Sequence, residues 1–202
     1  MRSLASSYRG YADLAKAQAE GEDYRVLVRP VAASSIAVIA PHGGRIEQYT
    51  SDIARGVAGG DFNLYSFEGI RQSGNYSTLH LTSHRFDEPR CLELLSKCDY
   101  VVAIHGCGGD DQRVLLGGLD GPLKLAIREA MHGIGVDAQS EDHPFPATDP
   151  KNICNRGRRG IGVQLELTIG LRLHGPRDAI CKAIRSVLMA LPNADRGRGQ
   201  GK

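Results

Sequence analysis

The sequence predicts an α/β fold: a single three-layer α/β/α domain built around a mostly parallel mixed sheet. The first observation is that short apolar, β-branched runs alternate with stretches of helical period, as they do where helices cover a parallel sheet. The second is the continuously apolar run YVVAIHG (100–106), which is typical of a strand buried on both faces. The third is size, because 202 residues with 41% hydrophobic and 24% charged side chains suit one domain with a sizeable core.

Strands and helices are expected to alternate along residues 1–192. The predicted strands are short runs of β-branched and aromatic residues, at 24–30, 36–42, 62–69, 79–86, 100–106, 133–138 and 162–168. The predicted helices carry apolar residues at helical spacing, at 45–57, 89–97, 121–133 and 175–191. Asp87 or Glu88 would begin the second helix, because Pro89 suits a first turn. The connection 140–160 is long enough to be functional, and the Gly/Arg-rich tail 193–202 is expected to be disordered.

Composition argues against several classes of protein. A net charge of +2 and 5% aromatic residues without Trp do not favour nucleic-acid binding. No run approaches the roughly 18 apolar residues of a membrane span, and the polar N-terminal stretch is not typical of a signal peptide. Five scattered cysteines indicate reduced thiols. We therefore expect a monomer that is made in the cytoplasm and binds neither nucleic acid nor membrane.

Two histidines follow predicted buried strands at the place where α/β proteins bind ligands. His42 ends the run IAVIAP and His105 ends YVVAI, and glycine follows each of them. Ligands gather outside the carboxyl ends of the strands in such sheets. Glu47 follows in what we expect to be the first turn of the next helix, close enough to His42 to share a ligand. Two histidines and a glutamate form a familiar set of catalytic zinc ligands that leaves one position for water.

A carboxylate for proton transfer is available in the run GVQLELT (162–168). Its polar row consists of Gln164, Glu166 and Thr168, although a central strand under helices should be apolar on both faces. Either this is an edge strand with one wet face, or Glu166 points into a cleft. In the second case Glu166 could take a proton from water and pass it to a leaving amine.

Other residues offer competing interpretations. His80 and His84 have even spacing on a predicted strand and could form an alternative metal pair. Cys107 lies two residues from His105, but nothing orients a base toward it, and a buried thiol is the simpler interpretation. The stretch HGCGGDD (105–111) lacks the Lys-Ser/Thr of a phosphate-binding loop.

Four motifs, PHGGRIEQYTSDIA, LHLTSHRFDEP, VVAIHG and NICNRGRRGIGVQLEL, occur in the order seen in the phage and bacterial poly-γ-glutamate hydrolase family. Over roughly residues 25–190 the chain resembles this family. The resemblance implies a zinc carboxypeptidase-like fold, Zn²⁺ bound by His42, Glu47 and His105, and Glu166 as general base and acid. It also implies hydrolysis of the γ-amide bonds of poly-γ-glutamate, a bacterial capsule polymer that phages strip from a host. A phage-encoded copy would be released by host lysis.

The chain departs from true carboxypeptidases in two ways. Those enzymes use H-x-x-E where this chain has H-x(4)-E, and their Asn-Arg pair for a terminal carboxylate precedes the second histidine. Here Asn155 and Arg156 follow His105. The departures favour an open groove that accepts internal bonds.

A polymer with one free carboxylate per residue calls for arginines along a groove, because the planar guanidinium donates two parallel hydrogen bonds. The principal candidates for substrate binding are Arg45, Arg156, Arg158 and Arg159, with Arg71 and Arg85 weaker. A solvated basic loop is the alternative for Arg158 and Arg159. Two other functions remain open: a zinc amidohydrolase acting on an acyl-amino acid or a peptidoglycan-type amide, and a non-catalytic metal- or carboxylate-binding protein.

Overall fold

The computed structural model describes residues 8–192, which form a seven-stranded mixed sheet in the order β1-β3-β2-β4-β7-β5-β6. The predicted tail 193–202 lies outside the described residues. The strands are β1 (Tyr24–Arg29), β2 (Ile36–Gly44), β3 (Asn63–Gly69), β4 (Tyr100–Cys107), β5 (Arg113–Gly117), β6 (Asp137–Gln139) and β7 (Val163–Thr168). The helices are α1 (Tyr11–Ala17), α2 (Thr50–Ala58), α3 (Asn75–Leu79), α4 (Pro89–Leu95), α5 (Gly121–Gly133), α6 (Ile169–His174) and α7 (Arg177–Met189), with a 3₁₀ helix, η1 (Ile153–Asn155).

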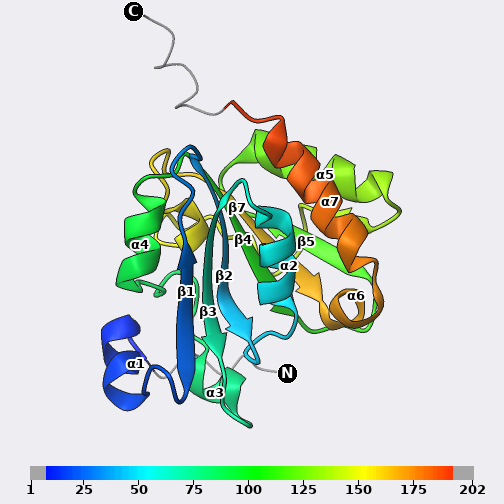
Figure 1. Cartoon of the computed structure of the whole chain (residues 1–202). Coiled ribbons are helices and arrows are strands. Elements are labelled where there is room, and N and C mark those ends of the chain that lie inside the picture. The colour runs from blue at the N-terminus through cyan, green and yellow to red at the C-terminus, as the bar shows by residue number, and fades with distance from the viewer. Residues whose placement is uncertain (1–7, 193–202) are drawn as a thin grey trace, which may run out of the picture.

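The predicted fold class is confirmed. Strands β3, β2, β4 and β7 run parallel in the centre, β1 is antiparallel to β3, and β5 is antiparallel to β7. Figure 1 shows α2, α5 and α7 on one side of this sheet and α1 and α4 on the other. Helices cover both faces, so β4 is apolar on both over most of its length, as the run 100–106 indicates.

Each face of the sheet has its own core. Val38, Val102 and Leu165 pack with the α2, α5 and α7 side, where α7 contributes Ile180 and Ile184 at helical spacing. The other face packs a second apolar cluster beneath α1, α4 and η1. On this second face the apolar cluster ends where β4 and β7 carry polar residues at their carboxyl ends. A site on this face can therefore form only beyond that cluster.

The chain order of the strands reverses between β2 and β4. The chain passes from β2 to β3 on one side and then crosses to β4 on the other side of β2. Such a reversal leaves a crevice at the carboxyl ends of the two strands, because their connections leave in opposite directions. His42 and His105 lie at these two strand ends.

The structure differs from the sequence predictions in several elements. The predicted strand 79–86 is instead the end of α3 followed by a connection. Its apolar alternation arises because Leu79, Leu81 and Phe86 are buried in the second core cluster, and burial of alternate side chains does not require strand pairing. Strand β5 and the short helices α1, α3 and α6 were not predicted, since elements of five to seven residues carry little periodicity.

None of the helices in the described part of the chain has the length and apolar composition that crossing a membrane requires.

Candidate active site

A β-bulge at the end of β2 aims His42 at the crevice. The register of β2 against β3 shifts between Ala40 and Gly43, so Pro41 and His42 together span the length of one β3 residue. A bulge tolerates proline, which cannot donate to a ladder, and it redirects the neighbouring side chain. The ring of His42 is consequently 2% exposed and points into the crevice.

The sequence predicts Glu47 in the first turn of a helix, but in the structure it lies in a tight turn before the helix begins. Helix α2 begins at Thr50, and the Glu47 N–H donates to the carbonyl of His42 (3.0 Å). Gly44 allows this turn, because its φ of +62° is unfavourable for other residues. The turn returns the Glu47 side chain to His42, and the spacing H-x(4)-E is the length of this turn.

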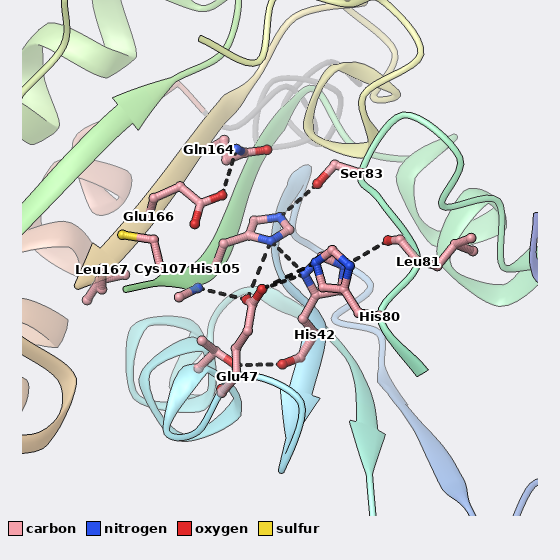
Figure 2. A network of polar contacts seen from close by, with 12 residues as sticks. His42, Glu47, His80, Leu81, Ser83, His105, Cys107, Gln164, Glu166 and Leu167 are labelled. Carbon is pink, nitrogen blue, oxygen red and sulfur yellow. Dashed lines mark hydrogen bonds and ion pairs between the residues drawn. The ribbon is translucent and has the colours of Figure 1, made fainter. Parts of the chain in front are cut away.

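Three donor atoms converge at the ends of β2 and β4. His42 Nδ1 lies 2.9 Å from Glu47 Oε1 and 3.0 Å from His105 Nδ1, and Glu47 Oε2 lies 3.7 Å from His105 Nδ1. His42 Nε2 lies 2.8 Å from the carbonyl of Leu81, so it carries the proton and donates. In the neutral imidazole this leaves the Nδ1 lone pair on the side of the other two groups, whose contacts with His42 are drawn in Figure 2.

This donor set fits a divalent metal such as Zn²⁺. Two imidazole nitrogens and a carboxylate oxygen are the ligands of many catalytic zinc sites. Partners around them hold the ligands in place, since Leu81 orients His42 and the Gly106 N–H donates to Glu47 Oε2 (2.7 Å). Without a cation, two lone pairs and a carboxylate would face one another. In the metal-free site, burial lowers the pKa of His42 but the Glu47 carboxylate outweighs it and raises that pKa, while burial and His42 lower the pKa of His105.

His80 offers a second combination of ligands. Its ring is tilted by 40° against that of His42 with centroids 4.0 Å apart, and its Nε2 lies 3.6 Å from Glu47 Oε1. The ligand atoms of His42, Glu47 and His80 lie within 4.8 Å of one another. Burial, and then His42, lower the pKa of His80 to about 3. His84 lines the same cavity but is exposed, and it does not belong to this group of ligand atoms.

Glu166 lies beside His105 because their strands pair in register. β7 is an interior strand between β4 and β5, and His105 is the Cα partner of Glu166. The polar row of β7 therefore does not belong to an edge strand. Gln164 donates to Glu166 Oε1 (3.0 Å), as Figure 2 shows. Burial, and then the charge of Glu47, raise the pKa of Glu166 well above its ordinary range, while Arg172 opposes the shift. A raised pKa suits a group that takes up and returns protons.

Arg172 is a buried cation in the same region that we did not predict from the sequence. It is 5% exposed, and its guanidinium donates to the carbonyls of Gln48 (2.7 Å), Cys107 (3.1 Å) and Leu167 (3.1 Å). These carbonyls lie within two residues of Glu47, His105 and Glu166 in the sequence, so Arg172 joins the three segments that carry the site. Gly106 makes room for it, since a Cβ there would lie 2.4 Å from Arg172 Cζ. No local sequence signal distinguishes this arginine from one on a helix surface.

The principal residues of the site line one cavity of about 1180 Å³. His42, Glu47, His80, His105, Glu166 and Arg172 line it. Further walls come from the connections around 80–84 and 144–149, which supports the expectation that the long segment after residue 140 serves a function.

The predicted substrate arginines do not all reach this cavity. Arg45 lines it, is exposed, and donates to the carbonyl of Arg71 (2.8 Å). Arg156 is exposed but does not line it. Arg158 pairs with Asp99, directly before β4, and Arg159 pairs with Asp120. The structure therefore brings only Arg45 of these four to the site, because the loop carrying the others lies near the amino end of β4.

Two further residues from the sequence motifs, Cys107 and Asn155, can be assigned from their surroundings. Burial, and then Glu166, raise the pKa of Cys107 to about 12, so its thiol stays protonated and is a poor nucleophile. Asn155 donates to the carbonyls of Ala147 and Asp149 and accepts from Gly162. Its amide therefore holds the loop together.

Comparison with protein families and curated sequences gives consistent matches. A family model described as poly-gamma-glutamate hydrolase matches residues 8–179. The chain is 35% identical over 167 residues to the UPF0714 protein YndL of Bacillus subtilis (strain 168), covering 82% of this chain and 65% of YndL. It is 36% identical over 166 residues to the SPbeta prophage-derived UPF0714 protein YoqZ of the same organism, covering 81% of this chain and 59% of YoqZ. The chain thus spans less than two thirds of the length of either relative.

Solved structures agree with these matches. A bacteriophage poly-gamma-glutamate hydrolase superposes with a TM-score of 0.85 and 31% identity, covering 91% of this chain and 96% of that one. A zinc-free apo form of YndL superposes with a TM-score of 0.83 and 30% identity, covering 92% and 98%. An N-formylglutamate amidohydrolase from Ralstonia eutropha, with a TM-score of 0.54 and 10% identity over 83% and 96% of the two chains, shares the fold alone.

Proposed function

The chain belongs to the poly-γ-glutamate hydrolase family, and on this basis we propose that it is a zinc-dependent hydrolase that cleaves γ-glutamyl amide bonds within poly-γ-glutamate. The observation that carries the proposal is the convergence of His42, Glu47 and His105 on one point, with Glu166 beside His105 in the strand register. Donors for one metal ion and a carboxylate for proton transfer then share one cavity.

His42 Nδ1, His105 Nδ1 and the Glu47 carboxylate would hold the ion. Zn²⁺ supplies a Lewis acid that polarises a carbonyl oxygen and lowers the pKa of water. Glu166 takes the proton from the attacking water and delivers it to the nitrogen of the leaving amine. Its raised pKa favours this exchange near neutral pH. The positive charge of Arg172 keeps two carboxylates, Glu47 and Glu166, compatible in one buried site.

An endo-acting groove is favoured over an exopeptidase pocket. The Asn155 amide, which would bind a terminal carboxylate in a true carboxypeptidase arrangement, holds its own loop. Arg45 is an exposed cation lining the cavity, and it is placed to meet the free carboxylate of a glutamyl unit. The relatives include a bacteriophage hydrolase and a prophage-derived protein, so we further propose that the activity serves phage attack on a capsule.

The test is a loss-of-viscosity assay on poly-γ-glutamate with purified protein, its zinc content measured, and Glu166→Gln alongside. We expect the wild type to lower the viscosity, a chelator to stop it, and Glu166→Gln to lose turnover while it keeps bound zinc. Hydrolysis of small acyl-amino acids without any loss of viscosity would identify a different amidohydrolase. Normal turnover by Glu166→Gln would refute the role of this residue.

A further inference from the structure

A directed chain of hydrogen bonds leads to Glu166 from the loop that ends at β7. The Cys154 N–H donates to Asn152 Oδ1 (3.1 Å), Asn152 Nδ2 donates to Gln164 Oε1 (3.0 Å), and Gln164 Nε2 donates to Glu166 Oε1 (3.0 Å). Asn152, Gln164 and Glu166 are 6%, 4% and 6% exposed, so water competes little for these bonds. The last bond of the chain is the one drawn between Gln164 and Glu166 in Figure 2.

The direction of this chain is set at its start. A backbone N–H can only donate, so the Cys154 N–H requires the oxygen of Asn152 on its side. Asn152 must then present its NH₂ group to Gln164, and Gln164 must present its own NH₂ group to Glu166. With either amide turned over, a carbonyl oxygen of Gln164 would face the Glu166 carboxylate.

Two features of the fold assemble the chain. Gln164 and Glu166 are two residues apart on β7, so both side chains lie on the same face of the sheet. Asn152 caps the 3₁₀ helix η1, and this fixes its side chain over the strand. The bond to Gln164 occupies Oε1 of Glu166, which constrains the rotation of the carboxylate beside His105.

We propose that Asn152 and Gln164 are positioning residues that hold the Glu166 carboxylate ready to accept a proton. The inference rests on the proposed role of Glu166 as general base and acid. It assigns to the long connection before β7 a part in the reaction beyond lining the cavity. Both residues act through Glu166 and are not expected to contribute to binding of the polymer.

The test is a double-mutant cycle with Asn152→Asp and Gln164→Met. In Asn152→Asp the new carboxylate still accepts from the Cys154 N–H, but it cannot donate to Gln164. The Gln164 amide should then turn over and direct its carbonyl oxygen at Glu166. Hydrogen bonds to a charged group typically correspond to about 10- to 100-fold in rate, so we expect kcat to fall by about 100-fold and KM to change by less than about threefold.

Gln164→Met removes the amide while keeping an unbranched side chain of similar size, and we expect a smaller fall in kcat, about 10-fold. The decisive result is the double variant. In the Gln164→Met background there is no amide to turn over, so Asn152→Asp should not lower kcat any further. Adding Gln164→Met to Asn152→Asp should therefore raise kcat by about 10-fold. A structural role for either residue would not produce this rescue.

Several outcomes would overturn the inference. If Asn152→Asp costs the same in both backgrounds, it acts through its charge or through the fold. If KM rises while kcat is unchanged, the two residues bind substrate. Zinc content and the thermal unfolding midpoint are measured for every variant. If Asn152→Asp does not fold, it is replaced by Asn152→Ala, which frees the Gln164 amide without adding charge. An inactive wild type or an active Glu166→Gln would instead refute the proposed function.

Discussion

Arg172→Met should destabilise the protein by removing the buried cation that joins the three site segments. Its guanidinium donates to the carbonyls of Gln48, Cys107 and Leu167, and the residue is 5% exposed. Methionine fills part of the same space but cannot donate. The three carbonyls would lose their partners where water reaches them poorly.

The expected loss is about 3–5 kcal/mol of unfolding free energy. Each hydrogen bond from a charged donor contributes about 1.5–3 kcal/mol. Relief from the cost of burying the guanidinium, which lowers the pKa of Arg172, offsets part of the sum. A change of this size is a large fraction of the stability of a typical domain, which is about 5–15 kcal/mol.

Urea unfolding of the metal-free proteins, followed by circular dichroism, measures the difference. Arg128→Met is the matched control, because Arg128 pairs with Glu129 on the surface and its loss should cost less than about 1 kcal/mol. An Arg172→Met variant within 1 kcal/mol of the wild type would show that the three carbonyls do not depend on Arg172. In that case the arrangement of the site segments must come from the strand pairing alone.

Three further predictions concern the site itself. In metal-free protein, burial raises the pKa of Glu166, so the unfolded chain releases this proton first as pH rises above about 4.5, and the stability of the wild type should fall relative to that of Glu166→Gln. Urea unfolding from pH 4.5 to 8 tests this, and unfolding free energies that change with pH in parallel for the two proteins would contradict it. His105→Gln should abolish stoichiometric zinc binding, whereas His80→Gln should retain it, because His105 Nδ1 lies 3.0 Å from His42 Nδ1. Equilibrium dialysis that gives the reverse order would favour the ligand set with His80. Arg45→Gln should raise KM for the polymer severalfold at low salt with kcat unchanged, because Arg45 is exposed in the cavity. An Arg128→Gln control should leave KM unchanged, and equal KM values in both variants would show that Arg45 does not bind the polymer.

The sequence was sufficient where chemistry is local or periodic. Continuous apolar runs identified β2 and β4 as buried strands, and parallel strands end at the same edge of a sheet, so His42 and His105 could be expected near one another. Glu47 could be added because it is close to His42 in the sequence, although the structure places it in a tight turn and not in the first turn of a helix. The polar row of β7 stood out because a strand covered by helices is expected to be apolar on both faces.

Residues that act through distant contacts escaped prediction. Arg172 donates to carbonyls up to 124 positions away, and Asn152 reaches Glu166 only through Gln164. His80 and His84 were expected at even spacing on a predicted strand, but His80 reaches the site from the end of a short helix. Arg158 and Arg159 were expected to bind the substrate because basic residues cluster there in the sequence. Their actual partners, Asp99 and Asp120, come from other parts of the sequence.

The sequence by itself determined the α/β class, the two strand ends with their histidines, and the carboxylate on the last strand. These follow from burial periodicity and strand direction, which are properties of neighbouring residues. Only the tertiary structure decided that β7 is interior, that Arg172 joins the three site segments, and that one amide chain leads to Glu166. Such features depend on which segments meet in space. Val163 of β7 pairs with Val102, and Arg172 donates to a carbonyl 124 positions away, and contacts over such separations leave no trace in local spacing.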